Sequence, residues 1–335
     1  MKFKNLIIGS NLLLASTFST FVIAGQPPVD DVCSISNASS TGSGWDIGSR
    51  NYGCTDDNGG NNVVFTVSIP AACTSGGCGL IIDIHGATMN AELQNRGSKL
   101  RQYGATAISR GASTPYIVVQ PNLSDLFDKN EIIDIGSLFG GAYANEMPVI
   151  EKFTDNVINR FNIDYNRIHM YGFSRGTHTA NEYYCSKEKG EMYASFVMHA
   201  EKLKCNPQKN KPLLQINGRK DFLTPNNQSV ENRRVIALLR SKNYKEVVIH
   251  SDPNWEKMIP EWLLLRGQYE HRRFTSGNKE QRFYESIEHS AKSGFLAGHC
   301  FPVKGDDYSG LEGRCLATFE IGEKIIDFFI KHELR

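Results

Sequence analysis

The sequence lacks an excess of charge of one sign. Its 335 residues include 37 lysines and arginines against 36 aspartates and glutamates, and no long run carries a single sign. A net charge of +1 provides no basic surface for a nucleic acid or an anionic membrane, so neither is expected as a partner. The interior of the sequence also lacks internal repeats and low-complexity linkers, which favours a single large domain.

Long hydrophobic runs are lacking as well, except at the N-terminus. Lys2 and Lys4 precede an apolar stretch over residues 6–24, and Val22 and Ala24 occupy the small-residue positions of a signal peptidase site. Serine, threonine and asparagine residues within the stretch make it a poor membrane anchor. We therefore expect a signal peptide over residues 1–24, cleaved after Ala24, and a soluble mature protein without a membrane span that is secreted or periplasmic.

The eight cysteines do not show the spacing of a zinc site. Cys73, Cys78 and His85 are the candidate ligands, and their spacing matches none of the usual zinc motifs. An even number of cysteines in an exported chain is typical of disulfides, so neither a metal nor a cofactor is expected. Many pairings are possible, but neighbours along the chain close the shortest loops. The expected pairs are Cys73–Cys78, Cys185–Cys205, Cys300–Cys315 and, by elimination, Cys33–Cys54.

Apolar, β-branched runs alternate with segments of helical periodicity through most of the chain. Several runs are apolar on successive residues, as in strands buried on both faces. The alternation predicts an α/β fold with a mostly parallel central sheet flanked by helices. Strands are expected at 63–69, 80–85, 116–120, 167–172, 195–200, 213–218 and 246–250, and helices at 147–161, 226–242 and 321–332.

Two stretches lie outside this alternation. Residues 25–62 are rich in glycine, serine, asparagine and aspartate, and we expect an irregular N-terminal segment there, before one α/β domain over residues 63–335. Residues 251–298 contain a predicted hairpin with its turn at Gly277-Asn278. We interpret this second stretch as an elaboration of the far end of the sheet.

The stretch YGFSRG, residues 171–176, places glycines two residues before and two residues after Ser174. A serine that caps a helix in a glycine-rich turn would explain these residues without any chemistry. However, the motif follows a predicted buried strand and precedes a predicted helix. In that context G-x-S-x-G is typical of a nucleophile elbow, a turn so tight that the flanking positions must be small. Ser174 is therefore the candidate nucleophile.

A serine nucleophile needs a base, and an acid that orients the base. On this architecture both follow the serine along the chain, the acid before the histidine, on loops after later strands. Asp221 comes directly after a predicted strand and is the candidate acid, with Asp252, one strand later, as the alternative. Among the nine histidines, His299 is the candidate base because it lies late in the chain, in a loop beside Cys300.

The oxyanion of an acyl intermediate needs two preorganised donors. The backbone N–H of Arg175 is the first candidate, which explains why a large side chain is tolerated directly after Ser174. The second is the N–H of Ala87, in the loop after the predicted strand 80–85. We accordingly interpret His85 as part of this turn rather than as a second base.

Four segments, IHGATMN, GFSRG, INGRKDFLTP and GHCFP, together resemble secreted α/β-hydrolases of the polyhydroxybutyrate depolymerase and feruloyl esterase group. The resemblance implies an α/β-hydrolase fold, a triad of Ser174, Asp221 and His299, and an oxyanion hole made by the amides of Ala87 and Arg175. Many of these depolymerases have a cysteine at the position of Ala87 and a small residue at that of Arg175. Those that act on solid polyester also tend to carry a linker and a polymer-adsorbing domain, and neither is found in this sequence.

The sequence thus predicts a secreted serine carboxylic-ester hydrolase that acts through an acyl-enzyme on Ser174. Its substrate would be a small ester, a polyester oligomer or an esterified polysaccharide. A serine peptidase on the same fold is one alternative, because a triad does not distinguish an ester from an amide. A non-catalytic binding protein is the other, although it would be expected to have lost a triad member. Trp255, in a turn after a predicted strand, is the candidate for a wall of the acyl pocket.

Overall fold

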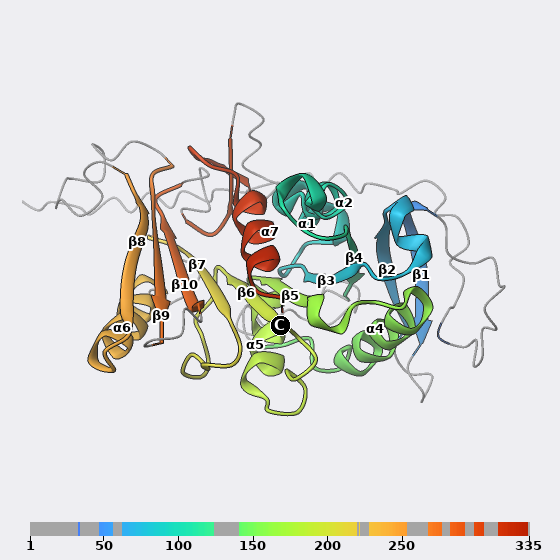
Figure 1. Ribbon diagram of the computed structural model, residues 1–335, viewed down its shortest axis with the longest axis horizontal. Helices are drawn as coiled ribbons and strands as arrows, with labels where there is room; N and C mark the ends of the chain where they lie inside the picture. Colours follow the sequence, from blue (N-terminus) through green and yellow to red (C-terminus); the bar gives the residue numbers. More distant parts are fainter. Residues whose placement is uncertain are drawn as a thin grey trace, which may run out of the picture.

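A large twisted sheet runs through the molecule in the computed structural model of the chain (Figure 1). The structure describes residue 33 and residues 47–55, 62–123, 141–219, 221, 228–252, 267–276, 282–291, 298–304 and 314–333. In these residues the sheet has ten strands, and β11 (Phe301–Val303) and β12 (Arg314–Leu316) form a separate parallel pair.

The order of strands across the large sheet is β1-β2-β4-β3-β5-β6-β7-β10-β9-β8. The six central strands from β4 to β10 are mutually parallel, whereas β1, β2, β9 and β8 pair with their neighbours in antiparallel fashion at the two ends. The strands are β1 (Gly48–Thr55), β2 (Asn62–Ile69), β3 (Gly79–Ile84), β4 (Tyr116–Asn122), β5 (Ile168–Phe173), β6 (Ser195–His199), β7 (Leu213–Gly218), β8 (Lys245–Ser251), β9 (Tyr269–Thr275) and β10 (Arg282–His289).

Helices cover both faces of the sheet (Figure 1). One layer holds α1 (Ala91–Ser98), α2 (Leu100–Ala105) and α7 (Ile321–Lys331), and the other holds α4 (Met147–Phe161), α5 (Arg175–Cys185) and α6 (Gln228–Ser241). Short 3-10 helices, η1 (Ala71–Ser75), η2 (Ala107–Arg110) and η4 (Tyr165–Arg167), lie in the connections. The mostly parallel α/β fold predicted from the sequence is confirmed.

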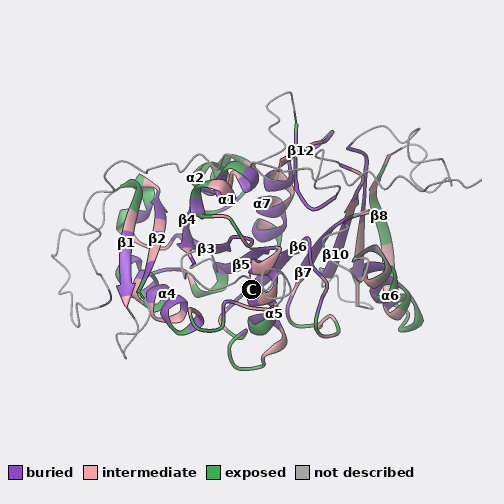
Figure 2. Ribbon diagram, turned by 180° about the vertical axis from the view of Figure 1, so that it is seen from behind, coloured by how far each residue is buried: buried purple, intermediate pink, exposed green. Residues whose placement is uncertain are grey.

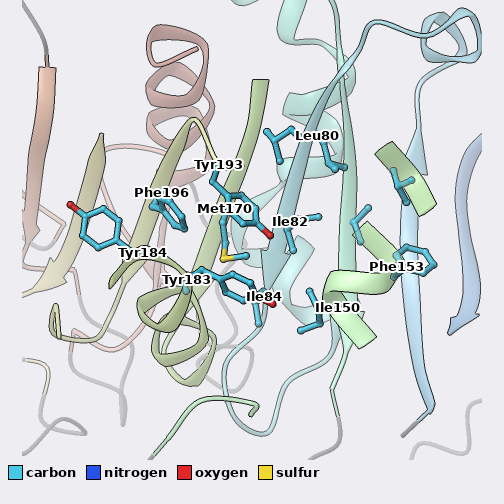
Figure 3. Packing of buried hydrophobic residues seen from close by; sticks show 14 of the residues in the cluster. Leu80, Ile82, Ile84, Ile150, Phe153, Met170, Tyr183, Tyr184, Tyr193 and Phe196 are labelled. Carbon is cyan, nitrogen blue, oxygen red and sulfur yellow. The ribbon is translucent and has the colours of Figure 1, made fainter. Parts of the chain in front are cut away.

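Alternate side chains of each central strand enter different layers, because successive residues of a strand point to opposite faces. Leu80, Ile82 and Ile84 of β3 belong to the apolar cluster under α4 and α5 (Figure 3), whereas Ile81 belongs to the cluster under α2 and α7. Figure 2 shows the resulting burial of the central strands. Burial on both faces explains why these strands are apolar at successive positions.

The N-terminal segment departs from the prediction, which was irregular structure over residues 25–62. Residues 48–55 form β1 and pair along their whole length with β2. Tyr52 and Cys54 are buried, and Cys54 forms a disulfide with Cys33. The sequence GSRNYGCT has little intrinsic strand propensity, so its strand conformation depends on this pairing and on the disulfide.

The position of the predicted strand 246–250 is a second departure. It forms most of β8, but β10 and β9 lie between it and the central strands, so β8 is an edge strand of the sheet. Val247, Val248 and Ile249 are therefore 40–47% exposed rather than buried. The antiparallel β9–β10 pair is the predicted hairpin, but β10 joins the central sheet directly through β7. Its turn at Gly277-Asn278 lies outside the described residues.

The structure contains four disulfides, Cys33–Cys54, Cys73–Cys78, Cys185–Cys205 and Cys300–Cys315. They are the four pairs that the sequence predicts. None of the helices in the described part of the chain has the length and hydrophobicity needed to cross a membrane.

Candidate active site

Ser174 lies in a strained turn between β5 and α5, with φ 51° and ψ −118°. The two flanking glycines are required by close backbone approaches. A Cβ atom on Gly172 would lie 2.3 Å from the carbonyl oxygen of Gly176, and one on Gly176 would lie 2.2 Å from that of Ile84. The motif thus has the geometry of a nucleophile elbow, in which the turn raises the serine at the carboxyl end of β5. With the strand order described above, it makes this an α/β-hydrolase fold.

Hydrogen bonds to β6 hold the elbow in place. The backbone N–H of Ser174 donates to the carbonyl of His199 over 2.8 Å. Thr177 Oγ1, one turn into α5, lies 2.7 Å from the carbonyl oxygen of Gly172 and 2.8 Å from that of His199. These contacts fix the first turn of α5 against two strands, so the strained backbone of Ser174 has little freedom to relax.

The structure brings Ser174, Asp221 and His299 into one hydrogen-bonded chain. His299 Nε2 lies 2.8 Å from Ser174 Oγ, and His299 Nδ1 lies 2.7 Å from Asp221 Oδ2. Asp221 and His299 are each only 6% exposed. Because the carboxylate can only accept, we assign the ring proton to Nδ1, which leaves Nε2 to accept the serine hydroxyl. This arrangement can remove the proton from Ser174 when the hydroxyl attacks a carbonyl carbon.

Contact between two loops positions Asp221 and His299. A Cβ atom on Gly218, at the end of β7, would lie 2.1 Å from the carbonyl oxygen of Gly298. The loop that carries Asp221 and the loop that carries His299 therefore touch backbone to backbone. The ring of Phe173 lies beside the imidazole of His299, tilted by 53° and with the centroids 5.3 Å apart.

The alternative acid, Asp252, is engaged elsewhere, and His289 lies buried without a hydrogen bond to an acid among the described residues. Asp252 accepts a hydrogen bond from the backbone N–H of Tyr269 over 2.6 Å and lies 3.3 Å from His250. His289, at the end of β10, is fully buried, and burial lowers its pKa to about 3. The geometry therefore favours Asp221 over Asp252 as the partner of His299.

The loop after β3 lies against Ser174, as an oxyanion hole would require. A Cβ atom on Gly86 would be 3.1 Å from Ser174 Cβ, and Ala87 follows, partly exposed. On the other side, Arg175 is the first residue of α5, where backbone N–H groups have no partner within the helix. The amides of Ala87 and Arg175 are thus placed on two segments that meet at Ser174.

His85 anchors this loop and is not a second base. Its Nε2 accepts a hydrogen bond from the N–H of Leu123 over 3.0 Å, and its Nδ1 lies 2.6 Å from the carbonyl oxygen of Gly86, to which it donates. Burial, and to a lesser degree the charge of Arg175, lower the pKa of His85 to about 4, although its bond to Gly86 acts in the opposite direction. Tyr143 Oη donates to the same carbonyl over 3.2 Å.

A buried carboxylate near the triad was not predicted from the sequence. Glu201 lies just after β6, 7% exposed, with Oε2 3.5 Å from His178 Nε2. Burial would raise the pKa of Glu201, but its bonds to His178 and to the N–H of Lys202, with the positive field of His299, bring it below the usual value. Its position after a central strand, at the edge where the triad residues lie, is the signal that could have identified it.

Trp255, predicted to line the acyl pocket, lies outside the described residues. Within the described residues, no group of three or more histidine, cysteine, aspartate or glutamate side chains could hold a metal ion.

No family model matches the sequence, and no curated protein matches it. Several solved structures are similar in fold. A thermostable esterase has 19% identity and a TM-score of 0.40 over 58% of this chain and 52% of its own, so this chain spans about half of its length. A ferulic acid esterase has 12% identity and a TM-score of 0.43 over 58% of this chain and 87% of its own. A poly(3-hydroxybutyrate) depolymerase from Bordetella parapertussis has 15% identity and a TM-score of 0.37 over 54% of this chain and 69% of its own.

Proposed function

We propose that the protein is a serine carboxylic-ester hydrolase with Ser174, His299 and Asp221 as its catalytic residues. The observation that carries the proposal is the continuous chain of hydrogen bonds from Asp221 Oδ2 through His299 to Ser174 Oγ, with the serine in a strained turn. A hydroxyl, an imidazole and a buried carboxylate in this order are the groups that nucleophilic acyl transfer needs.

In the proposed reaction, Ser174 Oγ attacks the ester carbonyl carbon while its proton passes to His299 Nε2. The amides of Ala87 and Arg175 stabilise the oxyanion that forms. His299 then returns the proton to the departing alcohol, which leaves an acyl group on Ser174. A water molecule, deprotonated by the same imidazole, hydrolyses this acyl-enzyme and releases the acid. Asp221 keeps the proton on Nδ1 and stabilises the imidazolium throughout.

The finer part of the proposal concerns the substrate and the compartment. The four segments quoted above support an ester of the kind cleaved by polyhydroxybutyrate depolymerases and feruloyl esterases, with Trp255 as a wall of the acyl pocket. The four disulfides support an oxidising compartment, as does the signal peptide predicted over residues 1–24, which lies outside the described residues. The catalytic unit would be the single domain over residues 63–335.

Assays with short p-nitrophenyl esters beside peptide p-nitroanilides test the proposal. The protein should hydrolyse the esters and not the anilides, and a fluorophosphonate should label Ser174 alone, as detected by peptide mass spectrometry. Faster turnover of the anilides would establish the peptidase instead. Absence of both turnover and labelling would favour the non-catalytic binding protein.

A further inference from the structure

Arg101 and Arg167 are buried arginines, and Arg175 differs from both of them. Arg167 donates from all three of its side-chain nitrogens, to Glu333 and to the hydroxyl and carbonyl of Thr114. Arg101 does the same, to Gln120, Glu92 and the carbonyl of Ala91. Both guanidinium groups are thus hydrogen-bonded at every nitrogen and paired with a carboxylate, as a buried cation is expected to be.

Arg175, directly after the candidate nucleophile, has no such partners among the described residues. Its Nε and Nη1 atoms are buried without a hydrogen bond, and no described carboxylate lies within ion-pair distance. Its guanidinium stacks on the ring of Tyr143, with Cζ 4.3 Å from the ring centroid. That cation–π contact compensates only part of the cost of removing a cation from water.

The contacts of Tyr143 place this charge beside the loop of the oxyanion hole. Tyr143 Oη donates to the carbonyl of Gly86, and its ring meets the ring of His85 edge to face. The positive charge of Arg175 also contributes to the lowered pKa of His85. The unpaired guanidinium therefore lies near His85 and Gly86, on the residue that follows Ser174.

We infer that Arg175 selects esters that carry a carboxylate, because the substrate supplies the counter-charge that the described residues do not. This inference rests on the proposed esterase function and adds a substrate class to it. Arginine suits the role because its charge is permanent and its planar group binds carboxylates strongly. The backbone N–H of Arg175 and its side chain would then act on different parts of one substrate, the oxyanion and the distant carboxylate.

The test compares substrates of equal length with and without a charge. Mono-p-nitrophenyl adipate carries the carboxylate on the acyl side, and p-nitrophenyl hexanoate is its neutral counterpart. On the alcohol side, 4-carboxyphenyl hexanoate is compared with phenyl hexanoate. The wild-type protein should prefer the charged ester of at least one pair in kcat/KM. Arg175→Met should reduce that preference by ~10- to 100-fold, and Arg175→Lys should restore part of it.

Arg160→Met is the matched control, because Arg160 is an exposed arginine near the end of α4. It removes the same charge from the protein but should leave the preference unchanged. Loss of the preference in Arg175→Met alone supports the inference. An unchanged preference in Arg175→Met, or an equal loss in Arg160→Met, overturns it.

Binding to an inactive variant separates this inference from the proposed function. Calorimetric titration of Ser174→Ala with mono-p-nitrophenyl adipate should show binding at least tenfold weaker when Arg175→Met is added. If the wild-type protein hydrolyses hexanoate but shows no preference and no charge-dependent binding, the inference fails and the esterase proposal stands. If no ester is hydrolysed and Ser174 is not labelled, the esterase proposal fails, and the titration alone then decides whether Arg175 binds carboxylates.

Discussion

Two pairs of histidine and carboxylate in this molecule have almost the same geometry but different surroundings. His299 Nδ1 lies 2.7 Å from Asp221 Oδ2, and His271 Nε2 lies 2.6 Å from Glu285 Oε2. The first pair joins two loops at the carboxyl edge of the central strands. The second joins the neighbouring strands β9 and β10 within the sheet. Distance alone therefore does not distinguish a catalytic pair from a structural one.

The groups around each pair make the difference. Arg273 donates to Glu285 over 2.6 Å, and His332 lies 4.0 Å from the same carboxylate. Burial would raise the pKa of Glu285, but the hydrogen bond to His271, the nearby His332 and the charge of Arg273 hold it well below its usual value. Glu285 is thus part of a cluster of compensating charges. In the other pair, the second nitrogen of the imidazole meets the hydroxyl of Ser174, a group that can react.

The largest expected effect comes from breaking the pair at the sheet edge. Ser174→Ala and His299→Ala should each lower kcat for p-nitrophenyl esters by ~10⁴-fold or more, and Asp221→Asn somewhat less, because triad members act as a unit. Circular dichroism should show that all three variants remain folded. Near-normal turnover in His299→Ala, together with loss of activity in His289→Ala, would assign the base to His289 instead.

Breaking the pair within the sheet should instead lower the stability of the protein and leave its activity almost unchanged. His271→Ala removes one partner of a buried carboxylate and should lower the free energy of unfolding by about 3 to 4 kcal/mol, near the lower end for a buried ion pair because Arg273 remains. The kcat/KM for esters should change less than twofold. Urea unfolding and ester kinetics on the same preparation measure both. A loss of activity at unchanged stability would mean that this pair contributes to catalysis.

The sequence could predict the site because its motifs are local and their order along the chain is fixed by the fold. The spacing of Gly172, Ser174 and Gly176 reports a tight turn directly, and the close approaches found at both glycines give the reason. Asp221 and His299 could be chosen because each follows a strand end or comes late in the chain. Their hydrogen bonds to one another are long-range and have no local signal.

The features that the sequence did not predict depend on which segments become neighbours. Residues 48–55 form a strand because β2 pairs with them, although their own composition favours irregular structure. The run 246–250 has the composition of a buried strand, yet it lies at the edge because β9 and β10 are inserted before it. The lack of partners at Arg175 likewise becomes visible only when its surroundings are assembled.

Two disulfides that close loops of similar length allow a test of whether a disulfide positions His299 at the sheet edge. Cys300–Cys315 spans 15 residues and adjoins His299, whereas Cys185–Cys205 spans 20 residues and begins at the last residue of α5. Replacing either pair by serine should cost about 3 kcal/mol of unfolding free energy. Only the loss of Cys300–Cys315 should also lower kcat, by ~10-fold. Equal kinetic effects of the two replacements would show that the disulfide does not position the base.

The buried carboxylate of Asp83 on β3 extends the comparison, because among the described residues no histidine and no cation is hydrogen-bonded to it. Gln94 donates to Oδ1 over 2.6 Å, and Gln120 and Ser98 donate to Oδ2 over 2.5 and 3.2 Å. Burial raises the pKa of Asp83 to about 6, since these bonds and the charge of Arg101 offset the loss of water only in part. The folded protein therefore holds this proton more tightly than the unfolded chain does, in contrast to Glu285.

This contrast has a consequence for stability against pH. The contribution of Asp83 to the free energy of unfolding should be fully present below about pH 4 and lost as the pH rises through about 6, a decline of at most about 3 kcal/mol. Asp83→Asn has no carboxyl group to titrate there, so its free energy of unfolding relative to the wild type should rise across this window and level off above it. Urea unfolding of both proteins between pH 4 and pH 7 measures the difference between their free energies of unfolding. The contributions of the other titrating groups are common to both proteins and cancel in this difference. A difference that stays flat would mean that the carboxylate of Asp83 is ionised in the folded protein throughout, and that amides and a hydroxyl can stabilise a buried charge as well as the histidines and arginine around Glu285 do.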